Sequence, residues 1–203
     1  MADALAPTTE LEAINVMLTN IGEAPVNSLE SGVGLDASTA QIVLKESSRH
    51  TQAIGWFWNS EHVRLSPDSS KNIILPLNTM KVRPIGQSSK YAYVYRAGKL
   101  YNREPFTNTY EFGSAVELEI TYELPFNDLP ETARRYITFV ASRMFQERKM
   151  GVQSISQQNR NDEARANAVL RQEENHVARR NVGNSSMSMM RILDRTQMSF
   201  WRS

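Results

Sequence analysis

Acidic side chains at alternating positions are the pattern in this sequence that comes closest to a catalytic site. Glu117, Glu119 and Glu123 fall on one side of a predicted strand, and Asp128 follows it. Two carboxyl groups about 5 to 9 Å apart can cleave a glycosidic bond, and side chains two residues apart on a strand meet that distance. The solvent-facing side of an antiparallel strand also carries alternating glutamates without any function, and we favour this interpretation. A glycan hydrolase that uses Glu117 and Glu119 is the alternative.

Other catalytic and ligand-binding patterns are missing from the sequence. Gly32 and Gly34 lack the further glycine and the lysine of a phosphate-binding loop, which argues against nucleotide hydrolysis. The histidines are His50, His62 and His176, which lie far apart and without carboxylates at metal-ligand spacing. With no cysteine, the chain has no disulfide, thiolate zinc site or cysteine nucleophile. We therefore expect no catalytic residue, metal site or cofactor.

Basic and tyrosine residues gather in the middle of the chain. They are Arg64, Lys71, Lys81, Arg83, Lys90, Tyr91, Tyr93, Tyr95, Arg96, Lys99, Tyr101 and Arg103. Platforms that bind single-stranded nucleic acid have this composition, because bases stack on aromatic rings. β-Hairpins have it too, because tyrosines pair across strands and lysines protect sheet edges. We favour the hairpin, and a small nucleic-acid-binding module is the alternative.

The composition predicts a folded, soluble chain. Its 203 residues are 40% hydrophobic, which is enough for a core, and the net charge of +1 argues against a large basic surface for nucleic acid. No run of about 18 apolar residues occurs, and the N-terminal MADALAPTTE lacks the basic start and apolar core of a signal peptide. We expect an unexported protein with one compact body, a substantial insertion and no membrane anchor.

Helical patterns precede this middle region. Thr9, with Glu12 three residues later, predicts a capping box for a first helix that ends at Gly22. A second helix is predicted over residues 38–54. The glycine-containing stretch between the two helices is typical of a loop. Residues 1–55 should therefore form the N-terminal part of a helical bundle.

The strongest helical pattern of the chain covers residues 128–150. Asp128 is the predicted cap, Glu131 can reach back to it, and apolar side chains then recur at helical spacing up to Gly151. A fourth helix over about 157–180 has a weak apolar stripe. Its predicted inward residues are Ala164, Ala168, Leu170, Val177 and Ala178. Because such a helix rarely stands alone in water, we expect it to pack on the bundle, whose C-terminal part should cover 128–180, or on a neighbouring subunit.

Strand patterns fill residues 56–127 and predict an antiparallel β-rich insert. The predicted strands cover residues 62–65, 73–77, 80–85, 91–95, 100–101 and 116–124. Pro76 places the second of these at a sheet edge, and Gly98 should supply the positive φ of a hairpin turn. The predicted fold class is therefore α+β, a bundle of about four helices with a β insert between the second and third helix.

The last segment, residues 181–203, is rich in apolar and arginine residues. Its candidate docking residues are Met187, Met189, Met190, Arg191, Ile192, Leu193, Arg195, Phe200, Trp201 and Arg202. Flexible methionines suit an adaptable docking segment, and arginine with tryptophan is typical of interface hot spots. We predict an extended docking tail; a tail that folds back onto its own core is the alternative.

The order of these elements, together with several segments, resembles tail tubular protein A, the adaptor-ring family of short-tailed phages. The segments are 13–15 with 21–30 (IGEAPVNSLE), 55–61 (GWFWNSE) and 93–103 (YVYRAGKLYNR). The long helix from Leu129 and the sequence at 161–165 also fit, so that the likeness covers about residues 10–171. Its specificity lies in the joint order of the segments, and the tail after Arg180 departs from the family.

The resemblance implies a virion protein with a mechanical role, and a hydrolytic side activity has been suggested for some relatives. Members form a dodecameric ring below the portal protein. The ring continues the DNA channel, carries the nozzle protein (tail tubular protein B) and helps to seat the tail fibres. Genomic DNA would pass through without specific binding, and assembly at the head–tail interface would take place in the host cytoplasm.

The resemblance also suggests which parts meet which partners. We expect the helices to form the ring wall, where heterologous contacts between copies close the ring. The docking tail would contact the portal. The β insert would face the nozzle and fibres through Tyr93, Tyr95, Arg96, Lys99, Tyr101 and Arg103.

Overall fold

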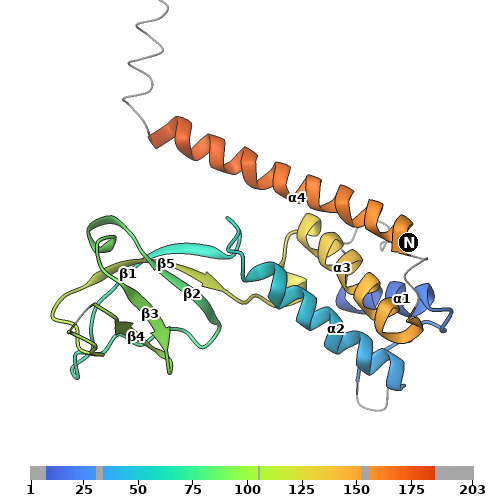
Figure 1. The fold of residues 1–203 in the computed structure, drawn as a ribbon, viewed down its shortest axis with the longest axis horizontal. Coiled ribbons are helices and arrows are strands. Elements are labelled where there is room, and N and C mark those ends of the chain that lie inside the picture. Colours follow the sequence, from blue (N-terminus) through green and yellow to red (C-terminus); the bar gives the residue numbers. More distant parts are fainter. Residues whose placement is uncertain (1–7, 31–33, 105, 152–155, 186–203) are drawn as a thin grey trace, which may run out of the picture.

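The computed structural model of the chain describes residues 8–30, 34–104, 106–151 and 156–185, with the side chains of 156–159 and 178–185 excepted. Its helices are α1 (Glu10–Asn20), α2 (Leu35–Gln52), α3 (Glu131–Met150) and α4 (Ser156–Ser185). Its strands are β1 (Ser60–Leu65), β2 (Thr79–Pro84), β3 (Tyr93–Arg96), β4 (Lys99–Asn102) and β5 (Val116–Tyr122), with 3₁₀ turns η2 (Gly86–Ser88) and η3 (Phe126–Asp128). Figure 1 shows α1, α2 and α3 at one end of the molecule, the strands at the other, and α4 running from the first end toward the second. This layout, with antiparallel strands between α2 and α3, confirms the predicted α+β fold class.

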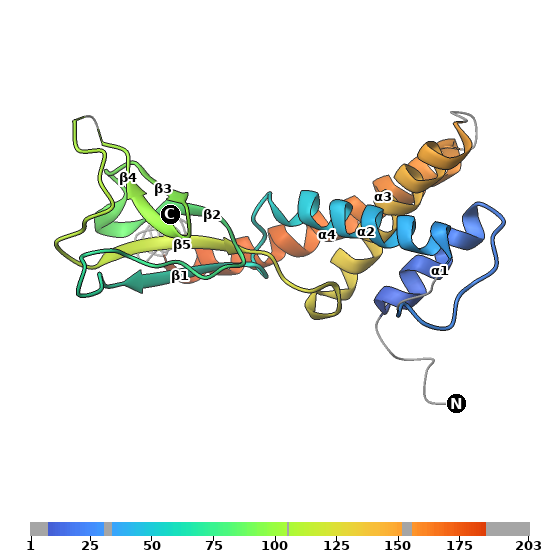
Figure 2. The same ribbon diagram turned by 90° about the horizontal axis from the view of Figure 1, so that it is seen from below.

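α3 is the centre of the helical body, by which we mean the four helices. α1 and α2 pack on one side of α3, and α4 packs on another (Figures 1 and 2). The largest fully buried side chains of this core are Ile14, Met17, Leu18, Leu44, Leu129, Ile137, Phe145 and Leu170. The apolar stripe predicted on the long helix is therefore the surface on which the other helices pack.

The first helix begins as the sequence predicts. The Thr9 hydroxyl accepts the N–H of Glu12 at 3.2 Å, and the Glu12 carboxylate accepts the N–H of Thr9 at 2.8 Å, so the capping box is confirmed. Gly22 follows the helix with a φ of +82°. The amide of Asn15 then holds the next loop, because it donates to the carbonyl of Val26 at 3.0 Å and accepts its N–H at 2.8 Å.

The start of α3 corrects the prediction, which placed the cap at Asp128. Asp128 belongs to η3, and the helix begins only at Glu131, after Pro130. Leu129 is extended because a residue before proline avoids the helical conformation, which delays the helix. The Glu131 carboxylate accepts hydrogen bonds from the N–H and the hydroxyl of Thr8 at 2.8 and 2.7 Å instead of reaching back to a cap.

β5 is the central strand of the β body, by which we mean the five strands. It pairs antiparallel with β1 on one side and β2 on the other, and β3 and β4 form a separate hairpin. Val116, Leu118 and Ile120 point to the same face of β5 and are buried in one cluster with the hairpin residues Tyr93 and Leu100. The apolar residues of the alternation predicted for this strand thus form one side of a second hydrophobic core.

The hairpin turn confirms the predicted role of Gly98, which has a φ of +77°. Ala97 before it also has a positive φ, +51°, a conformation that its residue type does not predict. Two successive positive φ angles are characteristic of the two-residue type I′ turn, whose twist matches that of the paired strands. The short loop therefore imposes the left-handed conformation on alanine.

The strand predicted over residues 73–77 is wrong. This segment forms a single bridge, between Ile74 and Lys99, while Ile73 and Leu75 insert their side chains into the core of the β body. Pro76 has no N–H to continue a ladder of hydrogen bonds, so the pairing stops there. The apolar run is therefore explained by the burial of Ile73 and Leu75 against the hairpin and not by strand pairing.

α4 runs antiparallel along α3, and its orientation partly corrects the prediction. Leu170 is fully buried as predicted and Val177 is half-buried, but Ala164 and Ala168 are exposed. The side of α4 that faces α3 is set by polar contacts of its glutamates, whereas the prediction used small residues as markers of the inward face. The remaining predicted position, Ala178, lies outside the described side chains.

Two further expectations concern the docking tail and membrane binding. The candidate docking residues between Met187 and Arg202 all lie outside the described residues. None of the helices within the described residues combines the length and apolar content that crossing a lipid bilayer requires.

Candidate functional site

The carboxylate of Glu117, near the start of the central strand β5, is held by the turn η2 that follows the edge strand β2. It accepts the N–H of Gln87 at 3.1 Å, and the N–H of Glu117 itself donates to the Ser88 hydroxyl at 3.0 Å. Gly86, at the start of this turn, has a φ of +53° and lies so close that a Cβ there would overlap the Glu117 carboxylate. These contacts give Glu117 a structural role in fixing the turn.

The other glutamates of the predicted acidic face also have partners. Glu119 pairs with Arg83 of β2, whose Nε lies 3.1 Å from the carboxylate, and with His62 of β1 at 3.7 Å. Glu123 pairs with Arg49 of α2 at 2.7 Å. Because each carboxylate is bound to a different neighbour, the arrangement favours the structural interpretation of these glutamates over a pair of catalytic acids.

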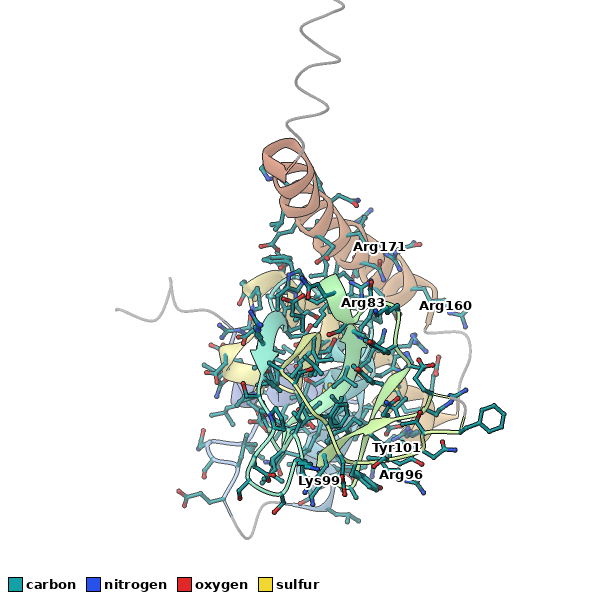
Figure 3. All side chains as sticks on the ribbon, turned by 90° about the vertical axis from the view of Figure 1, so that its left-hand side faces the viewer. Arg83, Arg96, Lys99, Tyr101, Arg160 and Arg171 are labelled. Carbon is teal, nitrogen blue, oxygen red and sulfur yellow. The ribbon has the colours of Figure 1, made fainter. Side chains whose placement is uncertain are left out.

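Metal binding has no candidate group in the described part of the chain. No cluster of three or more histidine or acidic side chains there could hold an ion. Figure 3 shows Arg83 on the side of the β body nearer to α4, opposite the hairpin. Around Glu119, the outer face of the sheet carries charges that are paired with one another.

The six hairpin residues predicted to face other tail proteins lie on two different sides of the hairpin. Tyr93 and Tyr95 turn toward the core of the β body, and the Tyr93 ring packs edge-to-face on Phe112 at 5.3 Å. Burial raises the pKa of the Tyr93 hydroxyl, and the nearby Tyr91 and Glu104 raise it further. Tyr93 therefore supports the hairpin from beneath.

The remaining predicted residues point outward. Arg96, Lys99 and Tyr101 share the outer face of the hairpin and gather at one edge of the β body (Figure 3). The Arg96 guanidinium lies over the Tyr101 ring, 5.1 Å from its centre, and Tyr110 packs edge-to-face with that ring, with ring centres 4.8 Å apart. Arg103 is exposed beyond the end of β4. This outer hairpin face is a preformed aromatic and cationic surface.

Gln52, at the end of α2, joins the helical body to the strand β5. Its side chain is fully buried, and its amide N–H donates to the carbonyl of Leu124 at 3.0 Å and to the Ser48 hydroxyl at 2.9 Å. Its amide oxygen accepts the N–H of Leu124 at 2.8 Å. The side chain thus satisfies both backbone groups of Leu124 at the point where the chain leaves the sheet for α3.

The chain crosses between the two bodies twice, after α2 and after β5. Asn59 makes the corresponding connection at the crossing after α2. It is 2% exposed, accepts the N–H of Trp56 at 2.8 Å, and donates to the carbonyls of Gln52 at 3.0 Å and Tyr122 at 2.9 Å. The Trp56 indole donates to the carbonyl of Thr51 at 2.8 Å. We call Gln52, Asn59 and the residues they bind the junction; it fixes the β body relative to the helical body.

Sequence reasoning missed the junction. Gln52 and Asn59 look like ordinary polar residues at a helix end and before a strand, and a polar residue there is usually exposed. The two tryptophans on either side of Phe57 were a usable signal, because large aromatic side chains so close in sequence predict a buried turn. In the structure, Trp56 and Trp58 stack with their ring centres 6.4 Å apart. A polar residue that directly follows a buried aromatic turn needs hydrogen-bond partners inside the protein.

α4 extends beyond the other three helices toward the β body. Its residue Glu173 contacts the Thr132 hydroxyl at the first turn of α3, and Glu174 accepts the N–H of Phe57 at the junction, at 3.0 Å. At about 1.5 Å per residue, the part of α4 after Glu174 adds roughly 16 Å. Figure 1 shows this end of α4 (orange to red) passing over the strands.

Comparisons with known proteins give one family for this arrangement. Residues 11–180, which include nearly all of α1, the whole β body and most of α4, match the family model described as "Tube: Tail tubular protein". The chain is also 33% identical over 128 residues to "Tail tubular protein A" of Klebsiella phage KP34, with 63% of this chain aligned. The alignment covers 66% of that relative, slightly under two thirds of its length.

Proposed function

We propose that this chain, which belongs to the tail tubular protein family, is the head-to-tail adaptor of its phage. Membership of the family confirms the resemblance read from the sequence and makes the chain a structural protein of the virion tail. In the proposed role, copies of the chain form a dodecameric ring that contacts the portal above and the nozzle protein below. The ring continues the DNA channel and helps to seat the tail fibres.

The observation that carries this proposal is the rigid junction between the two bodies. An adaptor has to hold the contacts at its two ends in a fixed relation, and a flexible linker between the bodies would lose that relation. Gln52 and Asn59 instead lock both crossings of the chain with buried hydrogen bonds. Such a scaffold suits mechanical joining.

The two bodies have different proposed partners. The helical body forms the ring wall, residues 181–203 dock on the portal, and the outer hairpin face with Arg96, Lys99 and Tyr101 meets the nozzle and fibres. Exposed arginine beside an aromatic ring supports the last assignment, because this pairing is enriched where proteins bind each other. Tyr93 and Tyr95 act by supporting that face.

Truncation of the tail tests the proposal. Because α4 continues to Ser185, the deletion should remove residues 186–203 and leave the helix intact. We expect the truncated protein to keep the thermal unfolding midpoint of the full chain and to lose its ability to join portal-containing heads, measured by co-sedimentation. A control chain in which Arg96 and Arg103 are replaced by serine should join heads but fail to recruit the nozzle protein. Normal joining of heads by the truncated chain would refute the docking role of the tail.

A further inference from the structure

Charge is distributed unevenly along this chain. Residues 1–44 contain six acidic residues and neither lysine nor arginine. Residues 129–203 contain thirteen basic and seven acidic residues. The first of these regions supplies α1 and the start of α2, and the second supplies α3 and α4, so the near-neutral total hides two oppositely charged parts.

The acidic residues of α4 are engaged with other groups of the protein. Glu163 pairs with Arg143 of α3 at 2.6 Å, Glu173 with the Thr132 hydroxyl, and Glu174 with the N–H of Phe57. The fourth, Asp162, lies 3.7 Å from Arg165 on α4 itself. The glutamates therefore mark the side of α4 that faces α3 and the junction.

The outer face of α4 carries unpaired positive charge. Arg160 and Arg171 lie eleven residues apart, or about three helical turns, so they project in the same direction; Figure 3 shows both on α4. Among the described residues neither pairs with a carboxylate, and the Arg171 Nε donates to the Asn167 amide at 2.6 Å. Ala164 and Ala168 are exposed between the two arginines, beside an open groove of about 640 Å³.

The outer face of α1 and the loop after it are acidic. Glu12 and Val16 lie on the exposed side of α1, where a shallow depression of about 460 Å³ runs along the helix, and Val16 is 43% exposed. Glu23 and Glu30 follow in the exposed loop, and within the described part of the chain their carboxylates contact no cation. Figures 1 and 2 place α1 across α3 from α4.

We propose that the outer face of α4 in one copy docks on the α1 face of a second copy. Opposite charges make the two faces complementary, and the small side chains of Ala164 and Ala168 leave room for Val16 of the neighbour to approach the α4 backbone. Because the faces lie on different sides of α3, each copy offers one of each, which is the arrangement of a heterologous interface that can continue to a ring. The inference rests on the self-association in the proposed function and names the surfaces that make it.

Charge reversal tests this pairing. The α4 variant carries Arg160→Glu and Arg171→Glu, and the loop variant carries Glu23→Lys and Glu30→Lys, which spares the capping residue Glu12. Sedimentation velocity of the full chain should show self-association that weakens between 50 and 500 mM NaCl. Each variant should associate at least about tenfold more weakly than wild type, because like charges then meet across the interface. A mixture of the two variants should recover association.

A matched variant controls for net charge. Lys81→Glu with Lys90→Glu changes the total by the same amount as the α4 variant but lies in the β body, and it should associate like wild type. Circular dichroism should give all variants the wild-type helix content, which separates lost docking from lost folding.

Three outcomes would overturn the inference. They are a wild-type chain that stays monomeric at low salt, unchanged association of both reversal variants, and an α4 variant that loses affinity for a duplex DNA probe while it associates normally. In the last case the arginines serve nucleic acid. A wild-type chain that stays monomeric would also count against the proposed ring, whereas unchanged association of the reversal variants would overturn only the two named faces. Joining of portal-containing heads is measured separately.

Discussion

The side-chain amide of Gln52 pairs with the backbone of Leu124 in the way that one strand pairs with another, with one hydrogen bond donated at 3.0 Å and one accepted at 2.8 Å. The two residues are separated by the entire β body, yet this contact places the end of α2 beside the exit from β5. The relationship makes a single side chain responsible for a connection between two hydrophobic cores.

Replacing Gln52 by alanine should destabilise the protein by about 3 kcal/mol. The substitution leaves the half-buried N–H and C=O of Leu124 without their partner and opens a cavity where the buried Gln52 side chain was, and each unsatisfied group costs about 1 to 3 kcal/mol. Urea denaturation followed by circular dichroism measures the change. Gln172→Ala, on the exposed side of α4, is the control and should change stability by less than about 0.5 kcal/mol. Equal stability of the two variants would remove the proposed importance of Gln52.

Asn59 and Gln52 should act as one unit. Asn59→Ala alone should cost about 3 kcal/mol, because it removes a donor to the carbonyls of Gln52 and Tyr122. The double variant should lose less stability than the two single variants added together, by at least about 1 kcal/mol, since residues in one hydrogen-bond network are coupled. A double-mutant cycle from urea denaturation measures this coupling, and strict additivity would show that the two crossings are independent.

Features encoded within a few residues could be predicted from the sequence. The capping box of Thr9 and Glu12, the positive φ at Gly98 and the stripe that buries Phe145 each depend on residue types at fixed local spacing. The predicted start of α3 was wrong because a proline changes the conformation of the residue before it. Pro130 moves the start of α3 past Asp128 although the capping pattern was present.

The candidate site depended on contacts between distant parts of the chain, and these were not predictable from one segment. The inward side of α4 is chosen by Arg143 and Thr132 on α3, so the alanines that looked inward face solvent. The burial of Gln52 and Asn59 requires both crossings of the chain to meet. A periodic pattern in the sequence indicates how much apolar surface a helix buries. It does not show which polar groups the neighbouring helix supplies, and in α4 these groups determine which side faces inward.

The ion pair between Glu46 and Arg148 should give the protein an acid-sensitive contribution to stability. The hydrogen bond from Arg148 lowers the pKa of Glu46 below its ordinary value of 4.5. A lowered folded-state pKa means that the contribution is present above pH 4.5 and is lost as the pH falls through the folded-state pKa. The difference in melting temperature between wild type and Glu46→Gln should therefore be positive at pH 7 and shrink below pH 4.5.

A matched glutamate separates this effect from general acid sensitivity. Glu61 is exposed on β1 and pairs with no cation among the described residues, so Glu61→Gln should follow the wild type at every pH. High salt should also reduce the contribution of Glu46, because the pair lies at the surface. A difference for Glu46→Gln that is constant with pH would show that the ion pair does not form in solution.

Replacing Glu117 and Glu119 together by glutamine should leave unchanged any release of reducing sugar that the wild-type protein gives from a polysaccharide substrate. We expect the double variant to lose stability instead, because Glu119 gives up its pairing with Arg83 and His62. A reducing-sugar assay and thermal unfolding on the same samples measure both effects. Loss of a measurable wild-type activity with no loss of stability would restore the hydrolase alternative.

Gly86→Ala should destabilise the protein more than Gly98→Ala, although both glycines have positive φ angles. Both substitutions incur the left-handed strain of roughly 1 kcal/mol, but around Gly98 a Cβ would meet open space, whereas at Gly86 it would collide with the Glu117 carboxylate. Shortening that side chain should relieve the collision, so Glu117→Ala should partly rescue Gly86→Ala in urea denaturation. Equal losses for the two glycine variants, with no rescue, would mean that Glu117 does not support the turn.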